Sequence, residues 1–509
     1  MSQLDKPNLI VPLAASYNQR ATSGINMTSG TADQRKINSI YQLVTNAMSG
    51  KSTLYLCKRP PIQNDSTIGA TTDIPYQIIS VASGGNTTNT WVFSTDTNGD
   101  VKVANTATSQ VILAASNDRW PRYVDKTLLS NVENIIVQIG DGTGQRVFFA
   151  TAIASWTEIT DADFTALTLT GKMEFMDGFA FIANNTQRIY NSDVNSLANW
   201  TATSFISKQI EQDAQLGLAR LGRVLLSFGR NSVEGFYNAG NTSGSPLGRI
   251  PQLSQKIGLY SYIVETGSSR DYYTVLDGRM YFVGVSQGSG AGSTKVSAPK
   301  LYSFDGSRFE PIVMPAFSAT ILAAKANFNY IGKITVGGES AVVLALSAVT
   351  TTTQKWLLFF PRLKEWFEWQ TVVAQPVNAG GYFLGVGNAT YAQKLGLLTE
   401  PPLNWMDGGS PSVSYTMTHQ FKLPSRGNHR KFMPVCGVIG DTQTSASDLT
   451  VEFSDDDYQN FSTGRTIDLT SQKKQLYRCG SYRDRAVRLT HSANTDCRLE
   501  AFVATVSDG

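Results

Sequence analysis

The chain has 509 residues, of which 41% are hydrophobic and only 16% are charged, and its formal net charge is +3. The hydrophobic content excludes intrinsic disorder, the small net charge gives no basic bias toward nucleic acid, and no apolar run approaches the ~20 residues of a membrane-spanning helix. The length allows about three domains.

Residues 1–60 are a mixed N-terminal segment in which one helix is predicted. Thr31, followed three residues later by Gln34, matches a capping box, and Ile37, Tyr41 and Val44 follow at helical spacing. A second helical pattern covers residues 208–216.

Residues 61–130 are rich in Thr, Ser, Asn and Asp. Short strands separated by turn residues of this kind predict small β-hairpins. We therefore expect this segment to be a β-hairpin insertion.

Residues 131–400 contain short β-type runs separated by tight turns, among them Asp177-Gly178, Asp277-Gly278 and Asp305-Gly306. Asp and Gly accept the positive φ angles that two-residue hairpin turns require. Strands of this length predict an all-β sandwich, barrel or propeller. The aromatic hairpin at residues 356–369 is typical of the outer part of a propeller blade, so we expect a β-propeller-like central domain.

Residues 412–509 follow a Pro- and Gly-rich linker and predict a separate C-terminal β-sandwich or barrel-like module. Residues 454–461 approximate the Asp-box turn, in which Ser and Asp side chains close a hairpin through bonds to the backbone. Four arginines follow this turn. They could contact phosphate or form ion pairs with the acidic residues at 455–457. Basic and acidic residues are nearly balanced in this module, which favours ion pairs with these acids. These arginines are Arg478, Arg483, Arg485 and Arg488.

Motifs that could carry chemistry are incomplete. Residues 284–288 spell a nucleophile elbow, but the Gly/Ser-rich run that follows does not predict the required helix. Residues 49–52 resemble the end of a phosphate-binding loop without its first glycine. Residues 96–100 resemble a calcium loop without its Gly and Glu, so a hairpin turn is the better interpretation.

Isolated titratable residues do not form an acid–base or metal-binding constellation. The histidines, His419, His429 and His491, have no paired spacing, and Asp161 and Asp163 lie in a turn where capping is the usual role. We predict no catalytic, cofactor-binding or metal-ligating residues, no cofactor and no enzymatic activity.

The four cysteines are few and widely spaced; they are Cys57, Cys436, Cys479 and Cys497. Disulfide-rich secreted domains contain many more cysteines for their length, and zinc sites need close pairs. The N-terminus also lacks the basic flank and apolar core of a secretory leader. We therefore expect reduced thiols and synthesis in the cytoplasm.

Several short motifs, taken in order, resemble the tail hub or nozzle proteins of short-tailed bacteriophages, the packaged-DNA stabilisation family. The resemblance covers residues from about 150 to 285 and from 412 to the end. Its motifs are residues 156–164, 176–179 and 188–193; residues 228–229 and 232–241; the Asp-box-like turn, the Arg-rich strand and residues 498–501; and Lys58-Arg59-Pro60-Pro61.

The resemblance implies a structural virion protein with a central β-propeller, made in the host cytoplasm. Six copies would form a homo-oligomeric ring below the portal and adaptor proteins. Double-stranded DNA would pass through the lumen without sequence-specific binding, and tail fibres, spikes or a plug would attach around it. A neutral polar surface suits such a ring, since few charges need desolvation at subunit contacts.

Two alternatives stay open. A propeller-type glycosidase or depolymerase would need two placed carboxylates, or a Tyr nucleophile with an arginine cluster. A sugar-binding tail adhesin would need repeated pockets, which the irregular hairpin spacing does not indicate.

Overall fold

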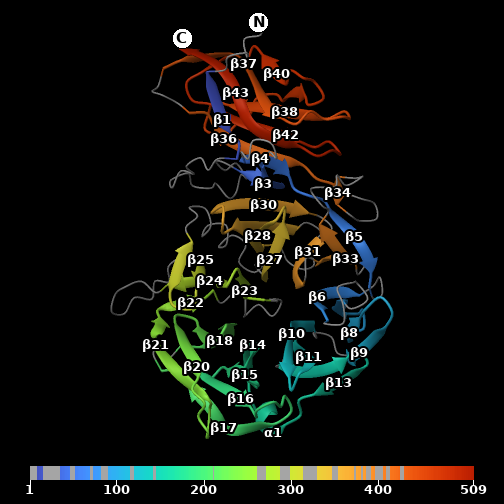
Figure 1. Cartoon of the computed structure of the whole chain (residues 1–509), viewed down its shortest axis with the longest axis vertical. Coiled ribbons are helices and arrows are strands. Elements are labelled where there is room, and N and C mark those ends of the chain that lie inside the picture. The colour runs from blue at the N-terminus through green and yellow to red at the C-terminus, as the bar shows by residue number, and fades with distance from the viewer. Residues whose placement is uncertain are drawn as a thin grey trace.

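The computed structural model is nearly all β and consists of a propeller and a terminal β module, which carries both chain ends (Figure 1). It describes residues 8–14, 35–45, 52–68, 73–81, 90–114, 120–140, 145–209, 211, 213–260, 271–286, 298–312, 330–346, 354–371, 374–379, 382–385, 391–395, 405–407, 413–424 and 429–508. The described part of the chain contains one short helix, α1 (Ala162–Thr165).

Seven antiparallel sheets of the described residues form the blades of the propeller and surround a common centre (Figure 1). Neighbouring blades touch through their innermost strands, as β14 does with β18 and β31 with β6. In chain order the blades comprise β6 (Ile74–Ser80), β7 (Thr90–Thr95), β8 (Val101–Ala104) and β9 (Ser109–Leu113); β10 (Trp120–Leu129), β11 (Val132–Gly140), β12 (Gln145–Ala152) and β13 (Ser155–Glu158); β14 (Leu169–Met176), β15 (Phe179–Asn184), β16 (Arg188–Ser192) and β17 (Trp200–Ser207); β18 (Gln215–Leu221), β19 (Val224–Gly229), β20 (Val233–Asn238) and β21 (Leu247–Gln255); β22 (Ile257–Leu259), β23 (Tyr273–Leu276), β24 (Arg279–Ser286), β25 (Lys300–Phe304) and β26 (Phe309–Ile312); β27 (Tyr330–Val336), β28 (Glu339–Ala345), β29 (Gln354–Phe360) and β30 (Glu365–Thr371); and β31 (Ala374–Ala379), β32 (Tyr382–Gly385) and β33 (Tyr391–Leu395) with β5 (Ile62–Thr67).

The ring closes through a strand that precedes the first blade. β5 pairs antiparallel with β33, with Ile62 opposite Leu395, and so completes the last blade. Residues 61–130 are therefore not an insertion, and this prediction is corrected: they supply β5, the whole first blade and β10 of the second. The few apolar residues of this segment suffice because Trp91 and Phe93 share one core with Ile135 and Val137 of the next blade.

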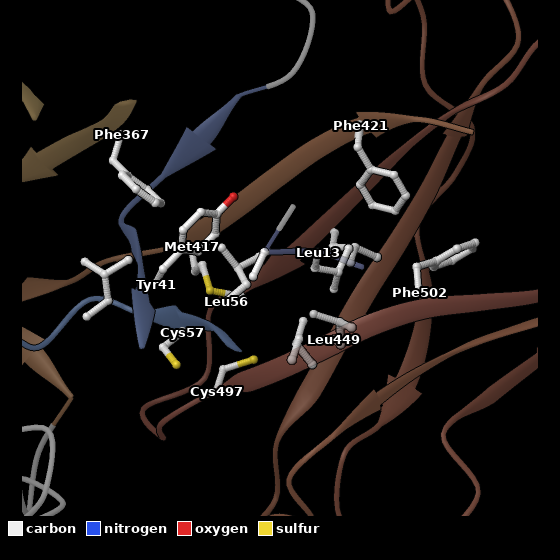
Figure 2. Close-up of a cluster of buried hydrophobic side chains, with 14 of the residues drawn as sticks. Leu13, Tyr41, Leu56, Cys57, Phe367, Met417, Phe421, Leu449, Cys497 and Phe502 are labelled. Carbon is white, nitrogen blue, oxygen red and sulfur yellow. The ribbon is translucent and has the colours of Figure 1, made fainter. Parts of the chain in front are cut away.

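The terminal module is a sandwich of two sheets that combines strands from both ends of the chain. Their apolar faces share one core, in which Leu13, Leu56, Phe421, Leu449 and Phe502 are buried together (Figure 2). One sheet contains β1 (Leu9–Pro12), β3 (Ser39–Thr45), β4 (Ser52–Lys58), β37 (Lys431–Gly440), β40 (Gln475–Tyr477), β41 (Ser481–Tyr482) and β43 (Arg498–Asp508); the other contains β36 (Met417–Lys422), β38 (Asp448–Ser454), β39 (Arg465–Asp468) and β42 (Ala486–His491). A further short pair, β34 (Met406–Asp407) and β35 (Val413–Ser414), precedes β36.

The helix predicted in residues 1–60 is wrong where the structure describes it, because β2 (Lys36–Ile37) and β3 occupy this region. Thr31 and Gln34 lie outside the described residues. β3 pairs along its length with β4, which buries Ile40 and Tyr41. These β-branched and aromatic residues suit a paired strand better than a helix, so the tertiary pairing overrides the spacing.

The helical pattern at 208–216 is also wrong: β17 ends at Ser207 and β18 begins at Gln215. The described part of the connection is held by an ion pair between Lys208 Nζ and Asp213 Oδ1. Asp213 additionally accepts from the backbone N–H of Asn231, at 2.6 Å, and of Ser232.

The predicted turn chemistry is confirmed at several places. Asp177 and Gly178 have φ angles of 51° and 84°, and Asp277 and Gly278 of 50° and 72°, as a type I′ hairpin turn requires. In the Asp-box-like turn, Ser454 Oγ donates to Asp456 Oδ1 at 2.7 Å and accepts from the N–H of Tyr458 at 3.0 Å.

The aromatic hairpin β29–β30 is the outer part of its blade, as predicted. Its two faces are both buried. Trp356 and Trp369 lie opposite each other and join the core of the module, whereas Phe359 and Trp366 join the core of the neighbouring blades. The hairpin is apolar on both sides because one face packs against the neighbouring blades and the other against the module.

Two features couple the propeller rigidly to the module. Through β2, a nine-stranded sheet continues from β30 into β36. Beside it, the fully buried Arg59 makes a two-pronged ion pair with Asp407, with Nη1–Oδ1 at 2.8 Å and Nη2–Oδ2 at 2.5 Å. Its Nε donates to Asn38 Oδ1 at 3.1 Å, and its guanidinium lies 3.8 Å from the ring centre of Tyr415.

Two buried histidines make the module sensitive to acid. Burial lowers the pKa of His419 and of His491 to about 3, and the charges of Lys36 and Lys58 add to this effect. In the unfolded chain the ordinary value is about 6.5. The folded state therefore stays neutral while the unfolded state gains protons, and the free energy of unfolding falls as pH drops from about 6.5 toward 3.

We expect His419→Gln to remove part of this pH dependence. Each histidine contributes a slope of up to about 1.4 kcal/mol per pH unit within this window. Urea unfolding at pH 7 and at pH 4.5 measures the change, and the exposed His429→Gln is the matched control. Equal pH dependence in the wild type and in His419→Gln would contradict the assignment.

Candidate functional site

A cavity of about 570 Å³ opens at the centre of the propeller. The innermost strands β10, β14, β18, β23 and β27, which surround the ring centre in Figure 1, contribute to its lining. Four acidic and four basic side chains line it: Asp125, Glu133, Glu174, Asp177, Lys126, Lys172, Arg220 and Lys333. The balance of charges favours a neutral polar ligand over a strongly charged one.

Close approach of β14 to β18 brings the inner strands together beside this cavity. Gly171 has a φ of 68°, and a Cβ on it would lie 2.4 Å from the Cα of Gly217. Any side chain here would push the two strands apart. The hydroxyl of Tyr272 fills the remaining space, accepting from the N–H of Lys172 at 3.2 Å and donating to the carbonyl of Leu218.

Lys172 is the buried cation of the site. Its Nζ lies 3.0 Å from Asp125 Oδ2 and 3.5 Å from Asp271 Oδ1. Burial lowers the pKa of Lys172, but the two carboxylates outweigh this and raise it well above the ordinary value. The lysine is therefore a fixed positive charge at the wall of the cavity.

Glu174 is the buried acid of the site. Tyr273 Oη donates to its Oε1 at 2.6 Å. Burial raises the pKa of Glu174 to about 8; Lys172 opposes this effect and Asp125 adds to it. At neutral pH the carboxyl is mostly protonated and can donate a hydrogen bond. Burial and the Glu174 charge also raise the pKa of Tyr273 well above its ordinary value.

The cavity thus combines a neutral acid, a phenol and a fixed cation. Such a set can hold hydroxyl groups by donating and accepting hydrogen bonds, and Glu174 can release a proton to a bound group. Among the described residues no cluster of three metal-ligating side chains occurs.

Alternation within β14 contained the signal that sequence reasoning missed. Lys172 and Glu174 are the two charged residues of a strand that is apolar apart from them and Thr170, and residues two apart project on the same side. The sequence did not identify their partners, because Asp125 lies on β10 and Tyr273 on β23, about 50 and 100 residues away along the chain.

The acidic residues that the sequence offered as candidates lie outside the cavity, and they have structural roles. Asp161 caps α1, accepting from the N–H of Asp163 at 2.9 Å, and Asp163 accepts from the N–H of Ala202 at 2.9 Å. Asp96 closes the hairpin turn by accepting from the N–H of Asn98 and Asp100, both at 2.9 Å.

Two of the four arginines pair with acids of the module, as the sequence favoured, whereas Arg478 and Arg483 are exposed. Arg485 binds Asp455 through two contacts of 2.7 Å, and Arg488 binds Glu452 through contacts of 2.5 and 2.7 Å. In the phosphate-loop-like motif only Ser52 is described, and the nucleophile-elbow motif is described only as far as Ser286, at the end of β24.

No protein-family model matches the sequence, and no curated protein sequence matches it. The chain is similar to solved structures at low identity. One, from the crystal structure of the mitotic checkpoint complex, has a TM-score of 0.35 and 9% identity, covering 66% of this chain and 93% of that chain. An exo-β-1,3-galactanase from Phanerochaete chrysosporium with galactose has a TM-score of 0.28 and 10% identity, covering 92% and 100%. YCF48 bound to a D1 peptide has a TM-score of 0.31 and 11% identity, covering 66% and 99%.

Similarity at this level does not extend to function. In the part of the chain that the structure describes, no helix is long and apolar enough to span a membrane.

Proposed function

We propose that this chain is a structural subunit of the tail nozzle of a short-tailed bacteriophage. Six copies form a ring that continues the DNA channel below the portal and adaptor, retains packaged DNA and lets it exit on ejection. Tail fibres, spikes or a plug attach to the ring. The protein is made in the host cytoplasm, becomes part of the virion and makes or breaks no covalent bond.

The observation that carries the proposal is an apolar strip on the outer sheet of the module. We define the strip as Ile10, Phe432, Ile439 and Tyr477, whose exposed fractions are 56%, 47%, 43% and 52%. Large apolar side chains that gather on one exposed face indicate a surface that another molecule covers.

Strand register places the whole strip on one face. Residues that lie directly opposite each other on paired strands project on the same face of the sheet. Three members of the strip lie opposite residues of β43: Ile10 opposite Val503, Ile439 opposite Ala501 and Phe432 opposite Ser507. Tyr477 is opposite Val435, which is itself opposite Thr505. The alternate residues Phe502 and Ala504 point into the core. A second copy of this chain is the proposed occupant, because a ring needs a heterologous contact on every subunit.

The motifs of the family resemblance support the proposal through what they do in the fold. Asp161 caps a helix, Asp177-Gly178 forms a hairpin turn, and Arg59 couples the propeller to the module. A subunit that must keep its shape around a channel depends on such contacts. The small net charge also limits salt-dependent retention of DNA in the lumen.

Electron microscopy of the purified full chain, and of particles, tests the proposal. We expect six-fold rings coaxial with the portal, with the strip at the contact between neighbouring copies. Ile439→Lys should shift the rings to monomers, whereas Val194→Lys, which changes an even more exposed apolar residue of the propeller, should not. A stable monomer at high concentration, or rings that leave the strip open to solvent, would contradict it.

The Tyr273–Glu174 pair favours a second candidate function, a propeller glycosidase or a sugar-binding tail adhesin. A phenol hydrogen-bonded to a carboxyl group, beside Arg220 in one cavity, matches part of the Tyr-nucleophile arrangement of some glycosidases. Cleavage of a neutral fluorogenic glycoside or of a host surface polysaccharide, lost in both Tyr273→Phe and Glu174→Gln, would establish the enzyme. Glycan binding without cleavage would establish the adhesin.

A further inference from the structure

The terminal module contains a pair of cysteines that the proposed function does not use. Cys436 lies on β37, and Cys479 lies just before β41; their Sγ atoms are 3.4 Å apart. Both side chains are buried, Cys436 completely and Cys479 with 6% of its surface exposed. We infer that these two thiols form a reversible disulfide when a peroxide oxidises the folded chain.

Backbone contacts hold the two cysteines in position for this bond. The N–H of Cys479 donates to the carbonyl of Met433 at 3.1 Å, and Met433 N–H donates to the carbonyl of Gly480 at 2.9 Å. Cys436 lies opposite Leu476 in the adjacent strand pair. The sulfur atoms need to approach by only about 1.4 Å to reach a disulfide bond length of about 2.05 Å.

The surroundings activate one sulfur of the pair. The hydrogen bond from Cys436 lowers the pKa of Cys479, burial opposes this, and the charges of Arg465 and Arg485 lower it further, to about 7. The pKa of Cys436 is raised well above its ordinary value by the same hydrogen bond and by burial. Cys479 is therefore the thiolate that reacts first, and Cys436 the thiol that resolves the product.

The reaction balances with hydrogen peroxide as the oxidant. The Cys479 thiolate attacks one peroxide oxygen, the O–O bond breaks, and a sulfenic acid forms. The departing hydroxide takes up the proton that the thiol had released and leaves as the first water. The Cys436 sulfur then attacks the Cys479 sulfur, the S–O bond breaks, the S–S bond forms, and a second water leaves. Two thiols and one hydrogen peroxide give one disulfide and two waters. Peroxide is small enough to reach a sulfur that is almost buried.

The other two cysteines provide an internal comparison. Cys57 and Cys497 also lie close together in the module core (Figure 2). Burial raises the pKa of Cys57 to about 12, and raises that of Cys497 above its ordinary range. They therefore hold no thiolate near neutral pH, and we expect them to stay reduced under mild oxidation.

Peptide mapping by mass spectrometry tests the inference on the full chain. After brief treatment with hydrogen peroxide at pH 7.5, we expect a Cys436–Cys479 cross-linked peptide that dithiothreitol releases, with Cys57 and Cys497 still reduced. The bond closes a loop of more than 40 residues, so the melting temperature of the oxidised chain should rise by about 4 °C. Cys479→Ala should lose this rise, and Cys497→Ala should keep it.

Three results would overturn the inference. They are sulfinic or sulfonic acid at Cys479 without a cross-link, a Cys57–Cys497 link formed at least as fast, and all four thiols left intact in the folded chain. The mapping of the wild-type chain decides between these results even where a variant fails to fold.

Discussion

Arg59→Met is expected to lower the free energy of unfolding by about 3–5 kcal/mol, because it leaves the carboxylate of Asp407 buried without its cation. Arg59 has no exposed surface, and Asp407 has 1%. Asp407 would keep the N–H of Ile62 at 3.0 Å and the hydroxyl of Thr371 at 2.9 Å, but neither carries a charge. Loss of the Arg59–Asp407 ion pair should weaken the contact between the propeller and the module.

Urea unfolding of the full chain measures this effect. Arg308→Met is the matched control, because Arg308 pairs with Glu310 on the surface, where such pairs contribute at most about 1 kcal/mol. The double variant Arg59→Met/Asp407→Leu should recover part of the loss, since no unpaired charge then stays buried. If Arg59→Met lowers the free energy of unfolding by no more than Arg308→Met does, the buried ion pair does not couple the propeller to the module.

Glu174→Gln is expected to stabilise the folded chain above neutral pH. The pKa of Glu174 is about 8 in the folded state and ordinarily about 4.5, so the unfolded chain loses this proton at lower pH than the folded chain. The folded state binds more protons between these values, and the free energy of unfolding falls as pH rises from about 4.5 to 8. The total fall has an upper bound of about 5 kcal/mol. A glutamine does not titrate, so the variant lacks this pH-dependent decrease in the free energy of unfolding.

Denaturation at pH 5.5 and pH 8.5 checks the expectation. The variant should gain stability relative to the wild type by a few kcal/mol at the higher pH and by much less at the lower pH. Glu133→Gln also removes a carboxyl group from the cavity lining, at a more exposed position paired with Lys126, and controls for the change in total charge. If the stability difference between Glu174→Gln and the wild type is the same at both pH values, Glu174 is not a buried neutral acid.

The chain's turn chemistry and strand patterns are local, and for this reason the sequence alone determined them. Asp-Gly pairs accept positive φ at the hairpins, the Ser454–Asp456 turn closes through neighbouring side chains, and Asp161 caps the helix within three residues. These features predicted an all-β chain with a propeller-like centre and a separate terminal module. The pairing of Arg485 with Asp455 followed from charge balance in one short region.

Only the tertiary structure decided where the N-terminal strands belong and where the candidate site lies. β1 pairs with β43, and Asn8 contacts Val506 across nearly the whole chain. β5 closes a ring whose other strands follow it in the sequence. Lys172, Glu174, Asp125 and Tyr273 meet only because the inner strands of separate blades converge. Contacts between residues so far apart leave no local periodicity. Closing the ring costs chain entropy, and the apolar cores shared by neighbouring blades supply the free energy that offsets this cost.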